Sequence, residues 1–357
     1  MPFLKEYLPI LKLKQGEITA MKRLKLPLKV GVSPIFDAWP IDMAGKRATK
    51  IGYCASLTAR LHQLLPIKNF DVLFVDPYFA IEGAPSETPK QVCDALFHVP
   101  HSKKTHTQLP APVYRPSTPT SAFGSMDAAA QREGWALVRI RLADTSDPNL
   151  PTFLSSLTGR LGTKCKLGLV VDAERRVSTP VSAYASAYIS EFQASIDAYE
   201  WDKIVVASGS MPPNYAGLTK PGAEYDRYDF VFLEEMEKTI SQPVALSDYG
   251  PISPEFEELG FSNPTIAAKI KYLIGKNKWF IAREGVTNRL GGSLAEYVKC
   301  AQTITSKPFF AGKGYSWAED RLLDASTKNE AGQHVTWVSV ACVRHITKTA
   351  EDVSILP

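Results

Sequence analysis

The sequence has few cysteines and no long apolar run. Its five cysteines, Cys54, Cys93, Cys165, Cys300 and Cys342, stand far apart and form no CxxC pair. An odd number of scattered cysteines argues against a disulfide framework or a cysteine-ligated zinc ion, so we expect reduced thiols in the core. The apolar stretches are too short to span a membrane, and the first residues do not resemble a secretion signal. We therefore expect a cytoplasmic protein with no membrane partner.

The sequence also lacks a strong excess of one charge. Its formal net charge is +4, far below the bias of proteins that coat nucleic acids through charge alone. The chain is 45% hydrophobic and 22% charged, which is typical of a globular protein with a large core. Its 357 residues fit either two ordinary domains or one barrel with insertions.

The sequence does contain a pattern that repeats along the chain. The run from Lys166 to Arg175 is rich in Val and Leu, is too short for an ordinary helix, and breaks into charge at Asp172. Such a run is typical of a buried parallel strand with a charged carboxyl end. Similar runs are at residues 7–14, 29–36, 70–78, 135–142, 203–210, 244–249 and 278–283. Segments with helical spacing lie at 17–24, 50–65, 88–98, 150–161, 182–199, 230–236, 266–274 and 294–304.

Strands that alternate with about as many helices predict an α/β protein with a (β/α)8 barrel. The alternative is an open doubly wound α/β sheet. Such a sheet usually has a phosphate-binding glycine motif after its first strand, and the segment Lys12 to Gly16 is not such a motif. The pattern therefore favours the barrel.

We assign residues 1–305 to the barrel and residues 306–357 to a carboxyl-terminal extension that packs on it. An insertion is expected after the third strand, at about 80–134, because residues 100–124 are rich in Pro, Ser, Thr and His and have little periodicity. In the extension, the pattern predicts a helix at 317–325 and a long strand at 335–345.

Acidic residues at the strand ends are the candidates for catalysis. The carboxyl ends of barrel strands converge on one face, where Asp76, Asp172 and Asp248 would meet, with Glu17 as a further carboxylate. These groups would act as general acid or base, or would bind a divalent cation. Because no HxH or ExxH pattern identifies a metal, the cofactor stays open.

Basic and polar residues on the same face are the candidates for ligand binding. Arg139 lies inside an apolar run, where a buried guanidinium requires either a carboxylate partner or an anionic ligand. Both alternatives remain open. The full set that could surround a phosphorylated or other anionic ligand is Lys12, Arg139, Arg141, Arg175, Ser208, Tyr249, Arg283 and His345.

Nucleic-acid binding is a further alternative. Lys103 and Lys104 lie in the expected insertion, and the aromatic residues Tyr225 and Tyr228 flank Arg227. Aromatic stacking and phosphate contacts are what single-stranded nucleic acids require. The same aromatic spacing also fits the core of a helix.

Several short motifs together resemble the phage-encoded beta protein family of phages, prophages and satellite phages. They are Tyr7 to Lys12 followed by Gln15 to Glu17, Asp76 and Arg139 on their strands, Ser247 to Gly250, Arg283 to Gly285, and Trp337 eight residues before His345. Family members often carry a histidine pair where this chain has Arg344 and His345. The resemblance implies a protein of mobile elements, in some cases encoded with a small toxic partner in a phage-defence cassette, and it implies no established reaction.

Two functions follow from the sequence. The first is a barrel that binds an anionic, phosphorylated or nucleic-acid-related ligand with its strand-end residues and hydrolyses it. The second is a non-catalytic module of a phage-defence or toxin–antitoxin-like system, which acts through contacts to a protein encoded nearby or to nucleic acid.

Overall fold

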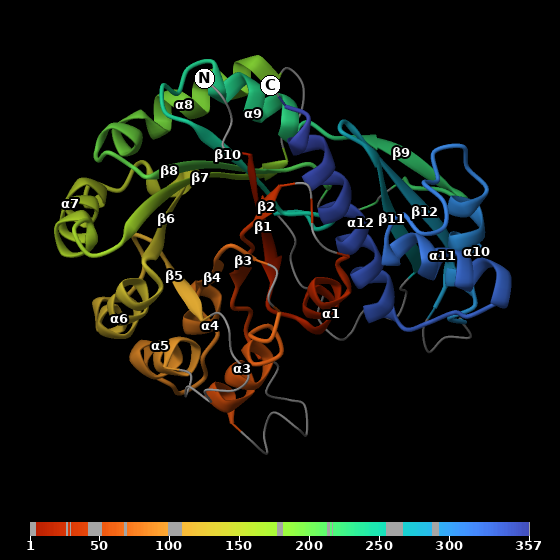
Figure 1. Cartoon of the computed structure of the whole chain (residues 1–357), viewed down its shortest axis with the longest axis horizontal. Coiled ribbons are helices and arrows are strands. Elements are labelled where there is room, and N and C mark those ends of the chain that lie inside the picture. Colours follow the sequence, from red (N-terminus) through yellow and green to blue (C-terminus); the bar gives the residue numbers. More distant parts are fainter. Residues whose placement is uncertain are drawn as a thin grey trace.

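A computed structural model of the chain describes residues 5–25, 28, 30–41, 52–67, 70–98, 109–176, 181–212, 215, 217–254, 267–287 and 293–356. Within these ranges, eight parallel strands close into a barrel, and a three-stranded antiparallel sheet with its helices lies beside it (Figure 1). The predicted (β/α)8 barrel is confirmed. The open sheet is excluded because the last barrel strand pairs with the first.

The barrel strands follow the order of the sequence around the ring. They are β1 (Glu6–Lys12), β3 (Ile35–Asp37), β4 (Leu73–Asp76), β5 (Pro110–Tyr114), β6 (Trp135–Arg141), β7 (Lys166–Arg176), β8 (Lys203–Gly209) and β10 (Val244–Asp248). The short β2 (Gly31–Val32) pairs with β1 just before β3 begins. The ring closes where Tyr7, Leu8 and Pro9 pair with Leu246, Ser247 and Asp248.

Apolar residues fill the barrel and also attach its helices. Alternate strand residues such as Ile10, Phe74 and Val170 pack together inside the ring, while their neighbours face the helices. The helices are α1 (Gln15–Arg23), α3 (Tyr53–Leu61), α4 (Tyr78–Glu82), α5 (Pro89–Phe97), η1 (Thr120–Ala122), α6 (Phe123–Glu133), η2 (Leu142–Asp144), α7 (Leu150–Leu161), α8 (Val181–Asp197) and α9 (Asp229–Glu237). Because their buried residues recur every three or four positions, as in α7, the sequence predicted most of them.

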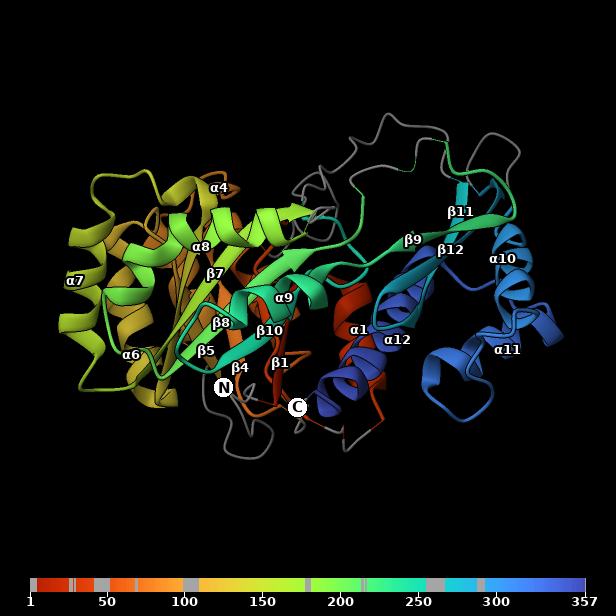
Figure 2. The same ribbon diagram turned by 90° about the horizontal axis from the view of Figure 1, so that it is seen from above.

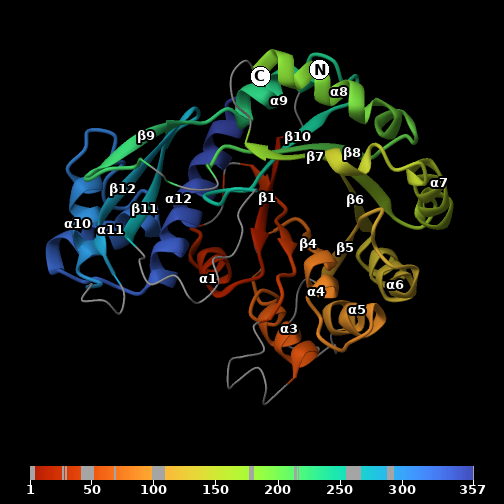
Figure 3. The same ribbon diagram turned by 180° about the vertical axis from the view of Figure 1, so that it is seen from behind.

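The rest of the chain forms a second unit on one side of the barrel (Figure 2). Its sheet has the order β11 (Ala267–Gly275), β12 (Lys278–Val286) and β9 (Gly222–Asp226), and its helices are α10 (Glu296–Thr305), α11 (Trp317–Lys328) and α12 (His334–Ser354). Helix α12 lies between the two units, with α1 and β1 on one side and β11 on the other (Figure 3). No helix in the described ranges is long and apolar enough to cross a membrane.

Three predicted elements near the carboxyl end are wrong. Residues 266–274 were expected to be helical, but 267–275 form β11, in which buried Ile270 and Tyr272 alternate with Lys269 and Lys271. Residues 278–283 form β12 of the antiparallel sheet and not the eighth barrel strand. Residues 335–345 lie in helix α12 and not in a strand. The helix packs against elements on two sides, so its apolar residues do not show a clear helical spacing.

The irregular structure predicted for residues 100–124 is also wrong in its second half. Residues 110–114 form the barrel strand β5, which the prolines at 110 and 112 concealed, since proline is rare inside a sheet. Helix α6 follows from residue 123. Lys103 and Lys104 lie outside the described residues.

Candidate functional site

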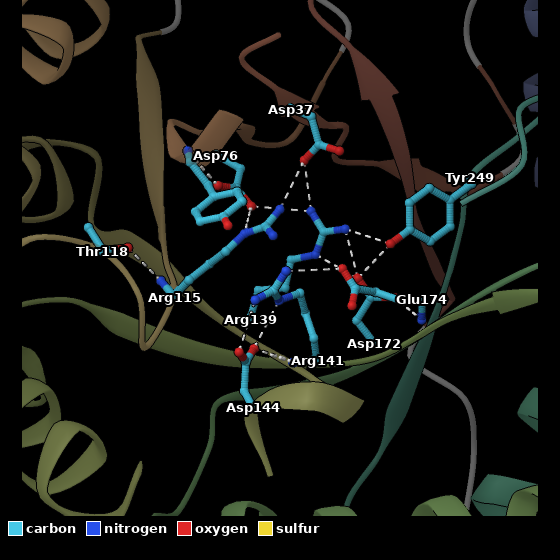
Figure 4. Close-up of polar contacts among 11 residues, drawn as sticks. Asp37, Asp76, Arg115, Thr118, Arg139, Arg141, Asp144, Asp172, Glu174 and Tyr249 are labelled. Atoms are coloured by element: carbon cyan, nitrogen blue, oxygen red, sulfur yellow. Dashed lines mark hydrogen bonds and ion pairs between the residues drawn. The ribbon is translucent and has the colours of Figure 1, made fainter. Parts of the chain in front are cut away.

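A buried guanidinium organises the polar residues at the barrel mouth, by which we mean the end where the carboxyl ends of the strands lie (Figure 4). Arg139 Nε donates to Asp172 Oδ2 at 2.7 Å, and Nη1 donates to Asp37 Oδ1 at 2.7 Å and Asp76 Oδ2 at 3.2 Å. Nη2 donates to the Tyr249 hydroxyl at 2.7 Å. Each nitrogen of this guanidinium therefore has a partner. We call these five residues the Arg139 cluster.

A second buried arginine adjoins the cluster. Arg115 follows β5 directly, and its Nε donates to Asp76 Oδ2 at 2.7 Å. Its guanidinium carbon lies 4.5 Å from the centroid of the Tyr78 ring and 5.1 Å from that of Phe79. Arg115 was not among the predicted site residues because β5 was not predicted as a strand. The usable signal was an apolar run that ends in arginine.

The carboxyl groups of the Arg139 cluster depend on this positive charge. Asp37 and Asp76 lie close together below the surface, where an unpaired carboxylate would be strongly destabilised. Burial raises the pKa of Asp37 and Asp76 adds to this effect, while Arg139 and Arg115 oppose it. Asp37 thus holds a proton more readily than an exposed aspartate does.

A pocket of about 110 Å³ opens above the cluster. We call it the mouth pocket, and its polar lining is formed by Lys12, Asp37, Arg139, Glu174, Tyr249 and Ser253. Trp39 and Phe79 line it as well, and Lys12 Nζ lies 3.5 Å from the centroid of the Trp39 ring. Burial lowers the pKa of Lys12 to about 8, against the opposing effect of Asp37 and Glu17.

Glu174 enters this pocket from an unusual backbone. Its φ of 47° lies in the left-handed region, where a residue other than glycine is strained, and the register of β7 with β8 shifts between Asp172 and Arg176. The Glu174 N–H donates to Asp172 Oδ1 at 2.9 Å, and Arg141 Nη1 lies 3.4 Å from its carboxylate. Burial, with a contribution from Asp172, raises the pKa of Glu174. Strain of this kind is common at functional sites, and no sequence pattern around Glu174 predicts it.

Two of the predicted site residues meet in a different place. Asp248 and His345 form a junction cluster with Tyr7, Arg227 and Asp229, where the barrel contacts the second unit. His345 Nε2 lies 2.9 Å from Asp248 Oδ1, Tyr7 OH donates to the same oxygen at 2.7 Å, and Arg227 Nη2 donates to Asp248 Oδ2 at 2.8 Å. All five residues are buried, and none of them lines the mouth pocket as the described residues form it.

The junction cluster has a strong effect on its central carboxyl group. Burial alone would raise the pKa of Asp248, but the imidazole of His345 and the guanidinium of Arg227 outweigh it and hold that pKa well below its usual range. Trp279 of β12 stacks on the His345 ring at 5.0 Å between centroids. Arg344, the residue before His345, instead reaches Glu319 at 3.2 Å.

The remaining predicted residues are dispersed. Glu17 is buried in α1, where burial raises its pKa to about 7. Arg141 pairs with Asp144 at 3.0 Å, and Arg283 of β12 donates to the carbonyl oxygen of Leu218. Ser208 is buried on β8. The side chain of Arg175 lies outside the described part of the structure.

The described residues contain no group of three His, Cys, Asp or Glu side chains that could hold a metal ion. A divalent cation therefore stays a prediction.

The fold and the mouth pocket define the class of this protein as a (β/α)8 barrel with a pocket at the carboxyl ends of its strands that polar and apolar side chains line together. The family model described as Beta protein matches residues 7–351. The chain therefore belongs to the Beta protein family, as the sequence resemblance predicted. No curated protein matches it.

Proposed function

We propose that the protein binds a small ligand with a phosphate-like anionic group in the mouth pocket and hydrolyses it. One observation carries this proposal. Lys12 lines the same pocket as Asp37 and Glu174, two carboxyl groups with raised pKa values. An ammonium group suits phosphate as a compact positive charge, and a raised pKa makes a carboxyl group better able to hold and transfer a proton than an ordinary one.

The anion contact is assigned to Lys12 because this cation lines the mouth pocket, whereas Arg115 and Arg141 do not line it as the described residues form it. The guanidinium of Arg139 donates its hydrogen bonds to carboxylates and to Tyr249, and that of Arg141 pairs with Asp144 and Glu174. A ligand anion would have to displace a carboxylate to reach either guanidinium. Arg139 is therefore a positioning residue that fixes Asp37 and Tyr249 at the pocket.

The size of the pocket limits what can enter it. A single buried water needs a cavity of roughly 10–15 Å³. The mouth pocket, at about 110 Å³, therefore admits a group as large as a phosphate or a sugar ring. Trp39 and Phe79 offer flat apolar faces for the rest of the ligand.

In the proposed reaction, the oxygen of a water attacks the phosphorus while the bond to the leaving oxygen breaks. One of the two carboxyl groups, Asp37 or Glu174, gives its proton to the leaving oxygen, and the other takes the proton of the water. Lys12 would stabilise the negative charge that develops on the phosphoryl oxygens.

The binding step is tested by thermal unfolding and calorimetry with inorganic phosphate and nucleoside monophosphates, each with and without Mg²⁺. We expect the parent and Lys278→Gln to be stabilised and Lys12→Gln to lose the effect. Lys278 is a matched control, because it is an exposed lysine of β12 that pairs with Glu224. Equal stabilisation of all three proteins would contradict the proposal.

The hydrolysis step is tested with Asp37→Asn and Glu174→Gln. Both variants should still bind the phosphate compound and should release product at least tenfold more slowly than the parent. Binding with no turnover in the parent would favour the alternative proposal, a non-catalytic module that acts through a protein or nucleic-acid partner.

A further inference from the structure

Three cationic side chains share one face of the antiparallel sheet in the second unit. Lys269 of β11 pairs in register with Arg283 of β12, and residues that pair directly across two strands point to the same side. Lys271 follows two positions later and points the same way. The opposite face, with Ile270 and Tyr272, is buried in the hydrophobic core, and the face of the lysines also carries the buried Leu273 and Ile281. We call Lys269, Lys271, Arg283 and the neighbouring Tyr215 the cationic face.

No described carboxylate neutralises these three cations. Lys271 Nζ donates to the carbonyl oxygen of Pro251. The guanidinium of Arg283 donates to the carbonyl oxygen of Leu218. Lys269 forms no ion pair within the described ranges. Burial and the like charge of Lys269 lower the pKa of Lys271 to about 7, and burial and Arg283 lower that of Lys269. Mutual repulsion in a half-buried place is relieved by a bound anion.

An aromatic ring completes this surface. The Nζ atoms of Lys269 and Lys271 lie 4.8 Å and 5.1 Å from the centroid of the Tyr215 ring. Tyr215 is half-buried and meets Tyr225 edge to face. Cations along a strand, about 6.6 Å apart at two-residue spacing, next to an aromatic ring suit a chain of phosphates that carries flat bases.

The cationic face adjoins the mouth pocket. Lys271 contacts the carbonyl oxygen of Pro251, and the next three residues, Ile252, Ser253 and Pro254, line the pocket. A chain that crosses the cationic face therefore passes the edge of the barrel mouth.

We infer that the cationic face binds the phosphodiester backbone of single-stranded nucleic acid, with Lys269, Lys271 and Arg283 on phosphates and Tyr215 against a base. The inference concerns a site outside the mouth pocket and does not depend on hydrolysis there. Single-stranded nucleic acid fits better than a lone phosphate, because several cations and a ring lie side by side.

The test is fluorescence anisotropy of a labelled ten-nucleotide oligothymidylate across a range of salt concentrations. Each single-strand phosphate contact contributes about 0.7 to the slope of log K against log salt, so Lys269→Gln/Lys271→Gln should flatten the slope by about 1.4. The charge-retaining Lys269→Arg/Lys271→Arg should keep the slope. Tyr215→Leu should weaken binding about tenfold and leave the slope unchanged.

Two further variants separate this inference from the proposed function. Lys12→Gln should keep the oligonucleotide slope even where it loses the response to phosphate, and Lys278→Gln should behave as the parent. No oligonucleotide binding by the parent, or an unchanged slope in the double glutamine variant, would overturn the inference whatever Lys12→Gln does.

Discussion

Arg139 shows what a single residue contributes to this barrel. Its guanidinium bonds to side chains of β3, β4 and β7 and to the residue after β10, so strands far apart in the sequence are joined at one point. A buried cation of this kind is stable only with its carboxylates, and these depend in turn on Arg139, with Arg115 as a further partner of Asp37 and Asp76. Arg139 is therefore a scaffold residue, and three groups that line the mouth pocket, Lys12, Asp37 and Glu174, carry the proposed chemistry.

Replacing Arg139 should destabilise the protein strongly. Arg139→Gln leaves Asp37, Asp76 and Asp172 buried without their common partner, and breaking a buried pair of this kind costs about 3–5 kcal/mol. Urea unfolding at pH 7 measures the loss. The control Lys278→Gln breaks an exposed pair and should unfold close to the parent. A midpoint for Arg139→Gln equal to that of the parent would show that the cluster does not hold the barrel together.

At the scale of the element, the contact between α1 and α12 joins the two units of the chain. A Cβ atom on Gly16 of α1 would lie 2.6 Å from Val338 Cγ1 of α12. The Ser339 hydroxyl donates to the Gly16 carbonyl oxygen at 2.7 Å. The two helices therefore pack with no room for a side chain at residue 16.

A methyl group at this contact should separate the helices. We expect Gly16→Ala to be destabilised by about 1–3 kcal/mol, the usual cost of overpacking. The control is Gly124→Ala in α6, where an added Cβ meets nothing within 4 Å. That variant should gain about 0.5–1 kcal/mol, since alanine is the better helix former. Thermal unfolding compares the two proteins.

A second substitution tests the cause. Adding Val338→Ala to Gly16→Ala removes Cγ1, the nearest clashing atom, but keeps Cβ at 2.9 Å, and it should recover part of the lost stability. If Val338→Ala gives no recovery, the clash at the contact between α1 and α12 is not the reason for the loss.

The sequence predicted those site residues whose strands it also predicted correctly. Asp76, Arg139, Asp172 and Tyr249 were expected to converge, because parallel strands bring their carboxyl ends to one face, and the structure brings them together. Arg115 was missed because two prolines concealed β5.

Arg283 and His345 were placed at the mouth because β12 was taken as a barrel strand and α12 as a strand that reaches back to the barrel. A short apolar run is compatible with either sheet, and a helix buried on two sides shows weak periodicity. The partner of such an element is set by contacts with distant parts of the chain, which the local sequence does not contain.

At the scale of the whole molecule, the junction cluster couples the barrel to the second unit. Its carboxyl group, Asp248, has a pKa below the usual range of aspartate, which is about 3.9 in an unfolded chain. A lowered folded-state pKa adds stability that is fully present above pH 4. This stability is lost as the pH falls through the folded-state value.

Removing the charge of Asp248 should therefore lower the free energy of unfolding at neutral pH, and should lower it less in acid. We expect Asp248→Asn to lose about 2–3 kcal/mol at pH 7, and the difference from the parent to shrink as the pH falls below about 4. Urea unfolding at pH 7, 5 and 3 measures it. Asp226→Asn, a change at an exposed residue of β9, is the control and should show no such dependence. A difference that is the same at pH 7 and pH 3 would contradict the assignment.

The proposed function requires that the mouth pocket present two carboxyl groups of raised pKa beside Lys12. Titration of carboxyl carbon resonances in ¹³C-labelled protein, with signals assigned through Asp37→Asn and Glu174→Gln, measures these pKa values. We expect pKa values for Asp37 and Glu174 above the ordinary 3.9 and 4.3 of unfolded chains, and a further change when phosphate binds. Ordinary or lowered values for both groups, unaffected by phosphate, would contradict it.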